Sequence, residues 1–574
     1  MQGARALVRV LAESGVRHVF GLPGDTGMAF YDALREAQGE IVHVMTRDER
    51  SASFMADAYA RVSRRLGVCE GPSGGGALYI VPGVAEAQGS AIPLLCLTSD
   101  TPVGQQGRGV LTELDQEGLF RPITKWNTRV NSAETMAEMT RRAVRMATSG
   151  RPGATHLSLP TDALEGETPD ASVYGLPDNA VAPALATRPD PAMVVRAADA
   201  LAAAERPVIV AGGGVMISGA WDELTALAEG LNVPVATSIN GKGAIAETSP
   251  VALGLVGGNG ARPYANAALA EADLIVYVGS RTESTTTSHW TLPPQDGQPA
   301  VIQIDIEPFE VGNNYRLVAG LGGDARLALA DLFAAVDRPQ VVRERNRARI
   351  EALLAERDAY WADVDAQAAV RSQPIKPAQL VREMRDLLGD DVLIVADPGT
   401  PTPFLGAQYE VRRPGRTTVI PRAHGGLGYA IPAVVGAWYA AEGRRVVGMT
   451  GDGSFGMSVG ELETISRLNL PIVIIQCSNN SFGWIKELQH LYHGDRYFGV
   501  DFDPVDYAAI ARGFGFRAGQ VTDPADVRGA LAEAFADGGP YFLDVVTESP
   551  ITETPPVAAW QAAEQRRAEA GTTA

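Results

Sequence analysis

Short apolar runs alternate with amphipathic helical patterns along nearly the whole chain. Runs such as Val392 to Ala396 and Tyr541 to Val546 consist mainly of branched aliphatic and aromatic residues, and Gly-rich turns separate many of them from the next helical pattern. Segments of this kind predict buried strands that are joined by helices. The pattern therefore predicts an α/β protein in which repeated strand–helix units form parallel sheets.

Two breaks in composition divide this pattern into three segments of similar size. Residues Leu164 to Pro191 are rich in Pro, Ala and Asp and lack periodicity, which predicts a linker. Residues Val341 to Val370 predict a charged helix that ends before Pro374. A chain of 574 residues is longer than a single hydrophobic core usually accommodates. We therefore predict three Rossmann-like domains and a C-terminal tail. Their predicted ranges are 1–165, 188–336 and 375–547 for the domains and 548–574 for the tail.

The composition is that of an ordinary globular protein, and its charge restricts the expected partners. Hydrophobic residues make up 45% and charged residues 20% of the chain, which disfavours a disordered protein. The net charge of -19 argues against nucleic acid or a membrane surface as a partner, because phosphate polyanions would be repelled. A small anionic ligand stays compatible, since it needs only a local site of N–H groups or a few arginines.

Cysteine usage and the N-terminal segment both predict a soluble, cytoplasmic protein. Cys69, Cys96 and Cys477 are far apart and form no CxxC pair, which disfavours a disulfide framework or a thiolate metal site. Residues Met1 to Val19 carry charges throughout and predict an amphipathic helix and a strand in place of a signal peptide. No apolar run approaches the length that a membrane span requires.

The most specific pattern is Gly451-Asp452-Gly453 followed by Asn479-Asn480. Each motif follows a predicted strand, so both should lie at the edge of a parallel sheet where α/β proteins bind ligands. Taken separately, each motif is usually an ordinary turn or loop. Their coincidence at this spacing is expected by chance on the order of once in a thousand chains of average composition.

The residues expected at this edge of the sheet predict a magnesium site beside a phosphate group. Asp452 and Asn479 would each present one oxygen, and the backbone carbonyl of Ser481 would add a third. Hard oxygen ligands of this kind suit Mg²⁺, which completes its octahedron with phosphate oxygens and water. Gly451 and Gly453 let the backbone approach the phosphates, toward which the N–H groups of Gly453 and Ser454 would point.

Gly-Asp-Gly and Asn-Asn at this spacing resemble the thiamine diphosphate motif, and the chain resembles enzymes of the acetohydroxyacid synthase type over nearly its full length. The resemblance implies thiamine diphosphate and Mg²⁺ as cofactors, with Asp452 and Asn479 as metal ligands. It also implies a pyrimidine-binding first domain, a middle domain and a diphosphate-binding third domain. Because members of this family form their sites between subunits, a homodimer or homotetramer is implied as well.

Thiamine chemistry also requires a carboxylate that hydrogen-bonds the pyrimidine ring, so that the cofactor can release its own C2 proton. The turn Arg47-Asp48-Glu49 joins a predicted strand to the helix Ser51 to Val62. It resembles the Arg-His-Glu turn of the family, with Asp48 where His is common. Glu49 is therefore the predicted activating carboxylate, although a glutamate at a helix N-terminus is also explained by the helix dipole alone.

Further loops match the family around the expected cofactor. The loops Gly21 to Gly24 and Gly71 to Gly76 would bring backbone close to the pyrimidine or the substrate. The loop Asp397 to Thr400 resembles the segment that cups the diphosphate, and Gly426 to Pro432 resembles the segment that supplies an apolar wedge beneath the cofactor. The predicted cofactor-binding residues in these loops are Gly24, Ser73, Gly75, Asp397, Gly399, Thr400 and Leu427.

The middle segment resembles the domain in which relatives bind FAD, ADP or the ADP part of coenzyme A. Asp305 at a strand end would hold a ribose hydroxyl, and Arg281 would meet a phosphate. The alternative interpretation, that the middle domain is purely structural and binds no nucleotide, has equal weight. FAD is the less favoured ligand because Thr282 to Ser288 is polar and unlike the flavin-binding stretch of the family.

The residues expected near the substrate depart from acetohydroxyacid synthases. Leu111-Thr112-Glu113 replaces the Phe-Gln-Glu of that family. In a helix that starts at Gly483, Ile485 would face the thiazolium ring, and Glu487 would lie near the substrate as a proton shuttle. His424 is a further catalytic candidate. For both Glu487 and His424, an ordinary surface role has similar weight.

These departures, together with the Trp- and Arg-containing tail, most resemble a 2-hydroxyacyl-CoA lyase, within a group that also includes oxalyl-CoA decarboxylase. Such an enzyme would cleave a 2-hydroxyacyl-CoA to an aldehyde or ketone and formyl-CoA, and the tail would close as a lid. An acetolactate synthase-like carboligase acting on pyruvate is the main alternative. A 2-oxoacid or oxalyl-CoA decarboxylase, or a non-catalytic protein that binds thiamine diphosphate or a nucleotide, is also compatible with the sequence.

Overall fold

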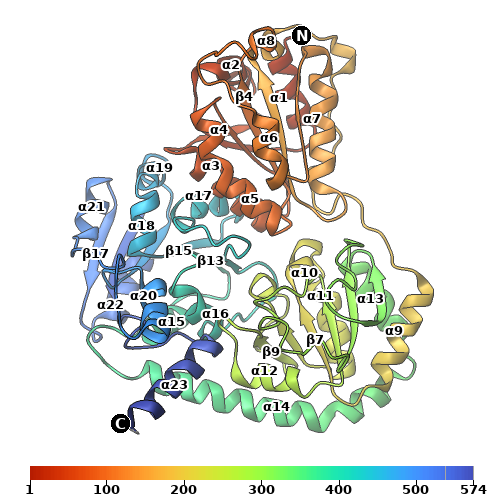
Figure 1. The fold of residues 1–574 in the computed structure, drawn as a ribbon, viewed down its shortest axis with the longest axis vertical. Coiled ribbons are helices and arrows are strands. Elements are labelled where there is room, and N and C mark those ends of the chain that lie inside the picture. The colour runs from red at the N-terminus through yellow and green to blue at the C-terminus, as the bar shows by residue number, and fades with distance from the viewer. Residues whose placement is uncertain (537, 573–574) are drawn as a thin grey trace. The chain divides into compact units, whose positions relative to one another are not determined.

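The computed structural model describes residues 1–536 and 538–572 and contains three six-stranded parallel sheets (Figure 1). The predicted α/β class with three Rossmann-like sheets is thereby confirmed. Residue 537 of the predicted third domain and residues 573–574 of the predicted tail lie outside the described residues.

The first sheet has the strand order β2-β1-β3-β4-β6-β5. Its strands are β1 (His18–Gly21), β2 (Val42–Met45), β3 (Gly67–Gly71), β4 (Leu94–Asp100), β5 (Trp126–Arg129) and β6 (Ala154–Pro160). The helices of this region are α1 (Gly3–Glu13), α2 (Met28–Glu36), α3 (Glu49–Ser63), α4 (Gly75–Tyr79), α5 (Val81–Gly89), α6 (Gln116–Phe120), α7 (Ala133–Thr148) and α8 (Thr161–Glu165). The central strands β4 and β6 are buried along their whole length, as is typical of parallel sheets covered on both faces.

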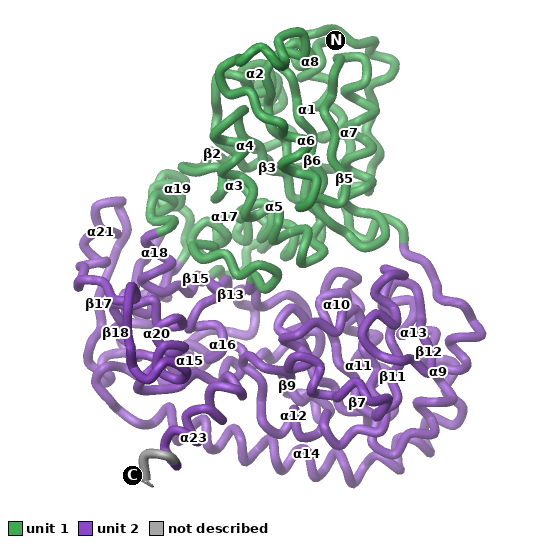
Figure 2. Tube along the Cα trace, in the orientation of Figure 1, with its two compact units in different colours: residues 1–185, 421–446, 457–472 green, residues 186–420, 447–456, 473–574 purple. Residues whose placement is uncertain are grey.

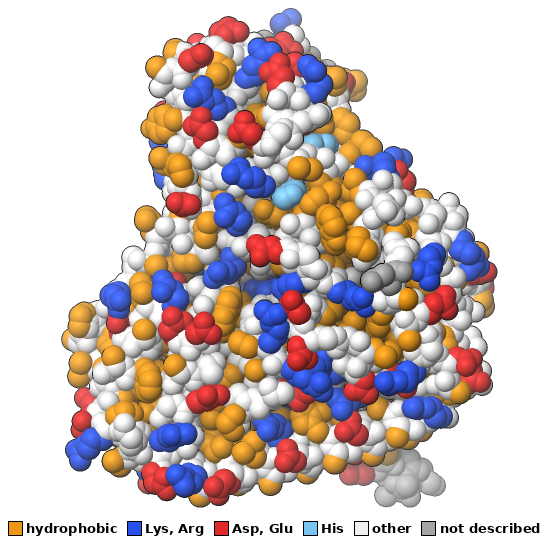
Figure 3. Space-filling view, turned by 180° about the vertical axis from the view of Figure 1, so that it is seen from behind, with side chains coloured by type: hydrophobic (Ala, Val, Ile, Leu, Met, Phe, Trp, Pro, Cys, Tyr) orange, Lys and Arg blue, Asp and Glu red, His pale blue; other side chains and the backbone are white. Residues whose placement is uncertain are grey.

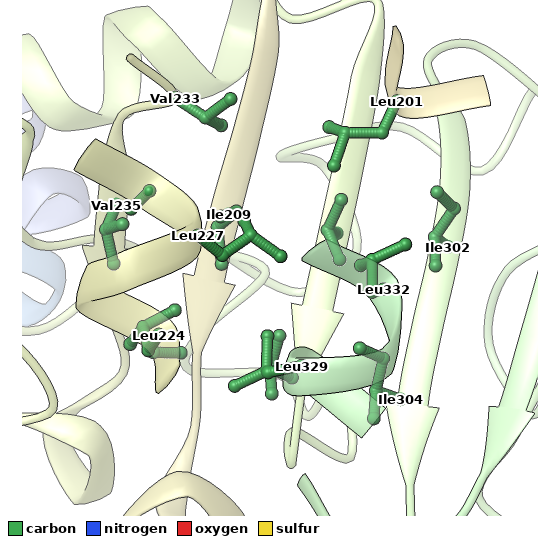
Figure 4. Packing of buried hydrophobic residues seen from close by; sticks show 14 of the residues in the cluster. Leu201, Ile209, Leu224, Leu227, Val233, Val235, Ile302, Ile304, Leu329 and Leu332 are labelled. Carbon is green, nitrogen blue, oxygen red and sulfur yellow. The ribbon is translucent and has the colours of Figure 1, made fainter. Parts of the chain in front are cut away.

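The second sheet has the order β12-β11-β10-β7-β8-β9. Its strands are β7 (Pro207–Ala211), β8 (Val235–Thr237), β9 (Ala252–Leu255), β10 (Leu274–Val278), β11 (Ala300–Asp305) and β12 (Leu317–Gly322). The helices are α9 (Pro191–Ala203), α10 (Gly213–Ser218), α11 (Trp221–Leu231), α12 (Pro263–Ala270), α13 (Ala325–Ala335) and α14 (Pro339–Ala368). Side chains such as Ile209 and Ile304 meet Leu224 and Leu329 in the core between strands and helices (Figure 4).

The third sheet has the order β14-β13-β15-β16-β18-β17. Its strands are β13 (Val392–Ala396), β14 (Thr418–Val419), β15 (Arg445–Gly451), β16 (Val473–Ser478), β17 (Arg517–Val521) and β18 (Tyr541–Val546). The helices are α15 (Pro377–Leu387), α16 (Pro401–Gln408), α17 (Ala430–Ala440), α18 (Asp452–Ser458), α19 (Glu461–Arg467), α20 (Gly483–His493), α21 (Tyr507–Gly513), α22 (Val527–Phe535) and the tail helix α23 (Ala558–Thr572).

Contacts along the chain divide it into two compact units (Figure 2). Unit 1 contains the first sheet and takes helices α17 and α19 from the third segment, whereas unit 2 contains the second sheet and most of the third. The residues of unit 1 are 1–185, 421–446 and 457–472, and those of unit 2 are 186–420, 447–456 and 473–574. This division does not follow the predicted boundaries, which stay a prediction.

Aspartate side chains cap the first turn of several helices. Asp48 accepts a hydrogen bond from the backbone N–H of Arg50 at the start of α3, and Asp190 and Asp324 cap α9 and α13 in the same way. A side-chain oxygen at this position satisfies one of the N–H groups that a helix leaves unpaired at its first turn. The cap at Asp48 defines the turn immediately before Glu49.

The molecular surface carries acidic and basic side chains interspersed on the face drawn in Figure 3. None of the described helices combines the length and the apolar character that crossing a membrane requires.

Candidate active site

The turn after β15 and the turn after β16 lie at the same edge of the third sheet. The two strands are neighbours and pair in parallel, with Gly451 opposite Cys477. Asp452 therefore follows one strand end and Asn479 lies one residue beyond the other. The Asp452 carboxylate joins the two turns, because Oδ2 accepts hydrogen bonds from the N–H groups of Asn479 (2.9 Å) and Asn480 (2.7 Å).

Asp452 is a buried carboxylate that the protein surrounds with N–H donors. Its Oδ1 accepts a third hydrogen bond, from the N–H of Gly453 at 2.9 Å. Burial raises the pKa of Asp452 to about 6, although these three backbone N–H groups act in the opposite direction. Among the described residues, no Lys or Arg forms an ion pair with this carboxylate.

The neighbouring residues complete a set of oxygens that fits a magnesium ion. Asn479 Oδ1 accepts a hydrogen bond from the Ser481 hydroxyl at 2.8 Å, which places the amide oxygen beside Ser481. One carboxylate, one amide oxygen and a nearby backbone carbonyl are hard donors that carry a negative charge, as Mg²⁺ requires. A Cβ at Gly453 would lie 2.7 Å from the ring of Phe482, so the turn beside Asp452 requires glycine.

The predicted diphosphate loop lies at the end of β13. The buried carboxylate of Asp397 accepts a hydrogen bond from the Thr450 hydroxyl at 2.6 Å and so holds the residue before Gly451. Gly399 and Thr400 are half-buried where α16 begins. Ser454, which follows Gly453 in α18, is buried. Asp397 thus orders the turn that carries the predicted metal ligand Asp452, and Gly399 and Thr400 are the more accessible part of the diphosphate loop.

Glu49 lies at the first position of α3 and packs against the Gly71 to Gly76 loop. Its side chain is only 7% exposed. A Cβ at Gly71 would lie 3.2 Å from Glu49 Cγ, and a Cβ at Gly76 would lie 3.1 Å from its Oε1. Burial raises the pKa of Glu49, and the nearby Asp48 carboxylate adds to this effect. Glycines at these two positions thus leave room for the Glu49 carboxyl group, whose pKa is raised by its burial.

Four hydroxyl groups gather beside this loop. Ser73 Oγ lies 2.7 Å from Thr112 Oγ1 and 3.1 Å from Thr26 Oγ1, and Thr26 Oγ1 lies 2.7 Å from Ser99 Oγ. Ser73 was predicted from the sequence, but the other three residues come from separate segments that share no motif, and one of them, Ser99, lies in strand β4. Only the unusual Leu-Thr-Glu sequence drew attention to Thr112.

The two remaining glycines of this region differ in their surroundings. A Cβ at Gly24 would lie 2.4 Å from the Pro72 side chain, so the two predicted loops touch each other at this point. Gly75, in contrast, has open space around its Cβ position, with only Tyr79 at 3.9 Å. Both glycines, together with Ser73 and Glu49, lie in unit 1.

Helix α20 begins at Gly483, as predicted, but it presents Ile485 and Glu487 to different surroundings. Ile485 is 47% exposed, whereas Glu487 is fully buried. Residues two positions apart point to opposite sides of a helix, so the two side chains do not share one face. Glu487 is thus enclosed in this structure, and its predicted place near the substrate stays a prediction.

The C-terminal tail forms the enclosure around Glu487. The ring of Trp560 lies 4.3 Å from that of Trp484, and both residues belong to an apolar cluster between α20 and α23. Burial raises the pKa of Glu487 to about 7, while His490 and the Thr554 hydroxyl act in the opposite direction. Neither carboxylate oxygen makes a hydrogen bond of normal geometry within the described part of the chain.

The other predicted site residues form two pairs, one in a loop of unit 1 and the other at strand ends of the second sheet. His424 is exposed and Leu427 is half-buried in the irregular segment before α17, which belongs to unit 1. Arg281 and Asp305 lie at the ends of the neighbouring strands β10 and β11, as predicted. Asp305 is buried and accepts a hydrogen bond from the N–H of Glu307 at 2.9 Å, whereas Arg281 is half-buried.

Each compact unit thus brings together one part of the predicted site. In unit 1, Glu49 meets the glycine loop and the hydroxyl cluster, and in unit 2, Asp452 meets Asn479 and Ser481.

Three family models match the chain in the order of its three sheets. They are the thiamine pyrophosphate enzyme N-terminal TPP binding domain (residues 1–119), the central domain (194–332) and the C-terminal TPP binding domain (397–545). The metal-binding turn, the residues beside it and Asp397 fall within the last of these ranges, and Glu49 falls within the first.

Curated relatives match over nearly the whole chain. A probable acetolactate synthase large subunit of Methanocaldococcus jannaschii is 34% identical over 557 residues, which are 96% of this chain and 92% of the relative. One from Methanococcus aeolicus is 33% identical, with 97% and 94% covered. The acetolactate synthase isozyme 3 large subunit of Escherichia coli is 29% identical, with 96% and 95% covered. The chain therefore belongs to the thiamine pyrophosphate enzyme family.

Proposed function

We propose that the protein is a thiamine diphosphate-dependent carboligase of the acetolactate synthase type. It would join two 2-oxoacid molecules, such as pyruvate, with loss of one CO₂. The observation that carries this proposal is the similarity to proteins named acetolactate synthase over 96% and 97% of the chain. The 2-hydroxyacyl-CoA lyase expected from the substrate loops has no counterpart among these relatives, so the carboligase comes first.

The residues of the third sheet would hold the charged end of the cofactor. Asp452, the Asn479 amide oxygen and the Ser481 carbonyl would bind Mg²⁺, which in turn would bind the diphosphate. The backbone at Gly399 and Thr400 would border the phosphates at the neighbouring strand end. When bound, thiamine diphosphate supplies a carbon nucleophile that adds to a 2-oxoacid, lets CO₂ leave and passes the remaining acyl carbon to a second carbonyl.

Glu49 would hold the proton at the pyrimidine nitrogen of the cofactor. Its carboxyl group is buried and has no cationic partner among its electrostatic neighbours, so its neutral form is favoured over that of an exposed glutamate. A proton-transfer group works best when its pKa lies near the working pH, and burial moves the pKa of Glu49 in that direction. The Ser73 and Thr112 hydroxyls beside the glycine loop are available to orient a polar substrate group.

Glu487 supports a second candidate function, the 2-hydroxyacyl-CoA lyase. A carboxyl group with a pKa of about 7 suits removal of a substrate hydroxyl proton near neutral pH. In the described structure the tail encloses this group, so the segment around Thr554 would have to move before a substrate reached it. Loss of cleavage in a Glu487→Gln variant that still binds the cofactor would support this second role.

Two accompanying expectations stay proposals. Arg281 and Asp305 are placed to bind a nucleotide at the ends of β10 and β11, whether ADP, the ADP part of coenzyme A or, as the less favoured ligand, FAD. A homodimer or homotetramer with sites between subunits is the assembly that the family resemblance implies.

Product analysis tests the proposed function. The purified protein with thiamine diphosphate and Mg²⁺ is incubated with pyruvate in one reaction and with a 2-hydroxyacyl-CoA in another. We expect acetolactate and CO₂ from the first, and formyl-CoA from the second would favour the lyase instead. Formation of neither product, with no other 2-oxoacid consumed, would contradict both candidates.

The Glu49→Gln variant tests the assigned chemistry. We expect it to bind the cofactor but to exchange the cofactor C2 proton roughly 10²- to 10⁴-fold more slowly, the usual contribution of a positioned acid or base. NMR of the bound cofactor measures this exchange, and Glu40→Gln, at an exposed glutamate of the same unit, is the control. Wild-type exchange in Glu49→Gln would remove Glu49 from its role.

A further inference from the structure

The loop of residues 422–428 is an irregular segment that carries two predicted site residues, His424 and Leu427. Gly425 and Gly428 adopt left-handed backbone conformations, with φ of 68° and 79°. His424 and Gly425 are exposed. An exposed glycine-rich loop gains much conformational entropy when it is released, so a defined position requires anchors outside the loop.

Glu86 on helix α5 anchors the first half of this loop. Its Oε1 accepts hydrogen bonds from the N–H groups of Arg422 (3.0 Å) and Ala423 (3.1 Å). Its Oε2 accepts the N–H of His424 at 2.9 Å. Glu86 is buried, so three consecutive backbone amides end on one carboxylate that is shielded from water.

A chain of buried side chains connects this anchor to the other end of the loop. Arg61 on α3 donates to Glu86 Oε1 at 3.0 Å and to Asp57 Oδ2 at 2.7 Å. Asp57 Oδ2 also accepts a hydrogen bond from the hydroxyl of Tyr429 at 2.5 Å. Tyr429 directly follows Gly428, so one network holds the backbone before the loop and the side chain after it.

Helix α3 fits closely against the same loop and the helix that follows it. The Phe54 ring lies 3.6 Å from the Cβ position of Gly426, and its centroid is 5.1 Å from that of Tyr429. A Cβ at Gly436 in α17 would lie 1.8 Å from the carbonyl oxygen of Met55, so the two helices touch through their backbones. The helix that begins at Glu49 therefore also determines where the loop lies.

The charge distribution assigns the anionic role to Glu86. Burial acts to raise the pKa of Glu86, but Arg61 and the backbone N–H groups outweigh it, so the pKa of this carboxyl is lowered. Burial raises the pKa of Asp57, for which Arg61 is the compensating charge. An anion that accepts three amide hydrogen bonds is a strong local restraint, because charge-assisted hydrogen bonds are stronger than neutral ones.

We propose that Glu86 is a positioning residue, whose carboxylate, linked through Arg61 and Asp57 to Tyr429, holds residues 422–428 in the conformation that presents Leu427 and His424 to the cofactor and the substrate. This inference rests on the proposed function and on the family resemblance, which implies that Leu427 lies beneath the bound cofactor. Glu86 itself touches neither cofactor nor substrate and acts through the loop.

The Glu86→Gln variant of the full-length protein tests the proposal with two measurements. Gln offers one acceptor oxygen, loses the charge that pairs with Arg61 and places an NH₂ group against the loop amides. We expect trypsin to cleave after Arg422 about tenfold faster, as mass spectrometry of the fragments would show, because losing charged hydrogen bonds costs roughly a factor of ten or more. We expect the cofactor concentration for half-maximal activity to rise by a similar factor of about ten, while kcat at saturating cofactor falls less.

Two further variants separate positioning from general stability. Tyr429→Phe removes only the hydrogen bond to Asp57 and should change both quantities in the same direction by a smaller factor. Glu247→Gln removes another buried carboxylate that pairs with cations and accepts a backbone N–H, but it lies in unit 2. It should leave the cleavage rate after Arg422 and the half-saturating cofactor concentration unchanged at a temperature where both variants are folded.

The outcomes are distinguishable. The proposal would be overturned if trypsin cleaved the Glu86→Gln variant after Arg422 at the wild-type rate and the half-saturating cofactor concentration were unchanged. Equal effects of Glu247→Gln on both quantities would also overturn it, since the loss would then be one of general stability. If the wild-type protein forms no acetolactate, the proposed carboligase fails, whereas the cleavage measurement still tests the anchoring of the loop.

Discussion

Two buried carboxylates of unit 2, Glu247 and Asp452, are satisfied in opposite ways. Glu247 pairs with Lys242 and Arg262, each at 2.7 Å, and accepts the N–H of Val411 at 3.1 Å. Within the described part of the chain, Asp452 accepts hydrogen bonds from backbone N–H groups only, those of Gly453, Asn479 and Asn480. The described residues thus supply cations to Glu247 and none to Asp452.

The pKa shifts of the two groups follow from this difference. Burial acts to raise the pKa of Glu247, but Arg262 and Lys242 outweigh it and the pKa is lowered. Burial raises the pKa of Asp452 to about 6 because N–H donors offset only part of the desolvation. A buried charge is stable only when it is paired or bound to a metal. We therefore infer a structural role for Glu247, and the difference supports the proposal that Asp452 binds an external cation such as Mg²⁺.

The surroundings of Glu247 support its structural role. Lys242 donates to the carbonyl of Gly406 at 3.1 Å, and Arg262 donates to the carbonyl of Ala407 at 3.1 Å. The cluster thereby connects loops of the middle segment to the last turn of α16 and, through Val411, to the residues that follow it. Asp452, in contrast, joins two turns that already lie at the same edge of the third sheet.

The largest effect is expected for Asp452→Asn. The amide has the same shape but no negative charge, and its NH₂ group would face N–H groups that now donate to Oδ2. Loss of an outer-shell partner typically lowers metal affinity roughly 10- to 100-fold, and loss of a ligand should cost more. We expect carboligase activity at micromolar Mg²⁺ to disappear, and activity measured over a Mg²⁺ series checks this. Wild-type Mg²⁺ dependence in this variant would contradict the comparison.

The fold and the position of the turn at Asp452 were accessible from the sequence because both are local features, whereas magnesium binding by this turn stays a prediction. Strand–turn–helix periodicity can be read within about one supersecondary unit. Gly451 to Gly453 and Asn479 belong to two short motifs, each of which follows a strand end. The strands Val392–Ala396 and Tyr541–Val546 were predicted with the bounds that the structure has. The helix predicted over residues 341–370 was observed as α14, Pro339–Ala368.

The rest depends on contacts between distant segments. The hydroxyl cluster joins Thr26, Ser73, Ser99 and Thr112 from four separate segments of the chain, and no short pattern encodes such a meeting. The burial of Glu487 depends on a tail that lies more than sixty residues further along the chain. The two-unit division arises because α17, which lies between strands of the third sheet, packs on α3 of the first region.

A smaller effect, on stability only, is expected for Glu247→Gln. Removing one partner of a buried ionic cluster leaves uncompensated charge and typically costs about 3–5 kcal/mol of unfolding free energy. Chemical denaturation followed by circular dichroism measures this loss. The Mg²⁺ dependence of activity should match the wild-type protein below the unfolding transition, and a selective loss of Mg²⁺ affinity would show that the two carboxylates do not differ as described.

The smallest effect concerns another buried carboxylate, Glu487, for which His490 and Arg567 offset only part of the effect of burial. Because its pKa is raised from 4.5 to about 7, the folded protein keeps a proton that the unfolded chain releases. Stability should therefore fall as pH rises from about 4.5 to about 7 and then level off. Glu487→Gln removes this dependence, so its Tm relative to the wild-type protein should increase between pH 5 and pH 8. An equal Tm difference at both pH values would show that Glu487 is not protonated in the folded state.

Isothermal titration of the purified wild-type protein with thiamine diphosphate, once with Mg²⁺ and once with EDTA, tests the central claim most directly. If Asp452 awaits an external cation, the titration with Mg²⁺ shows saturable binding, and the affinity falls by more than about tenfold in EDTA. Equal affinity with and without the metal, or no binding in either titration, would contradict the assignment of Asp452, Asn479 and Ser481 as a magnesium site.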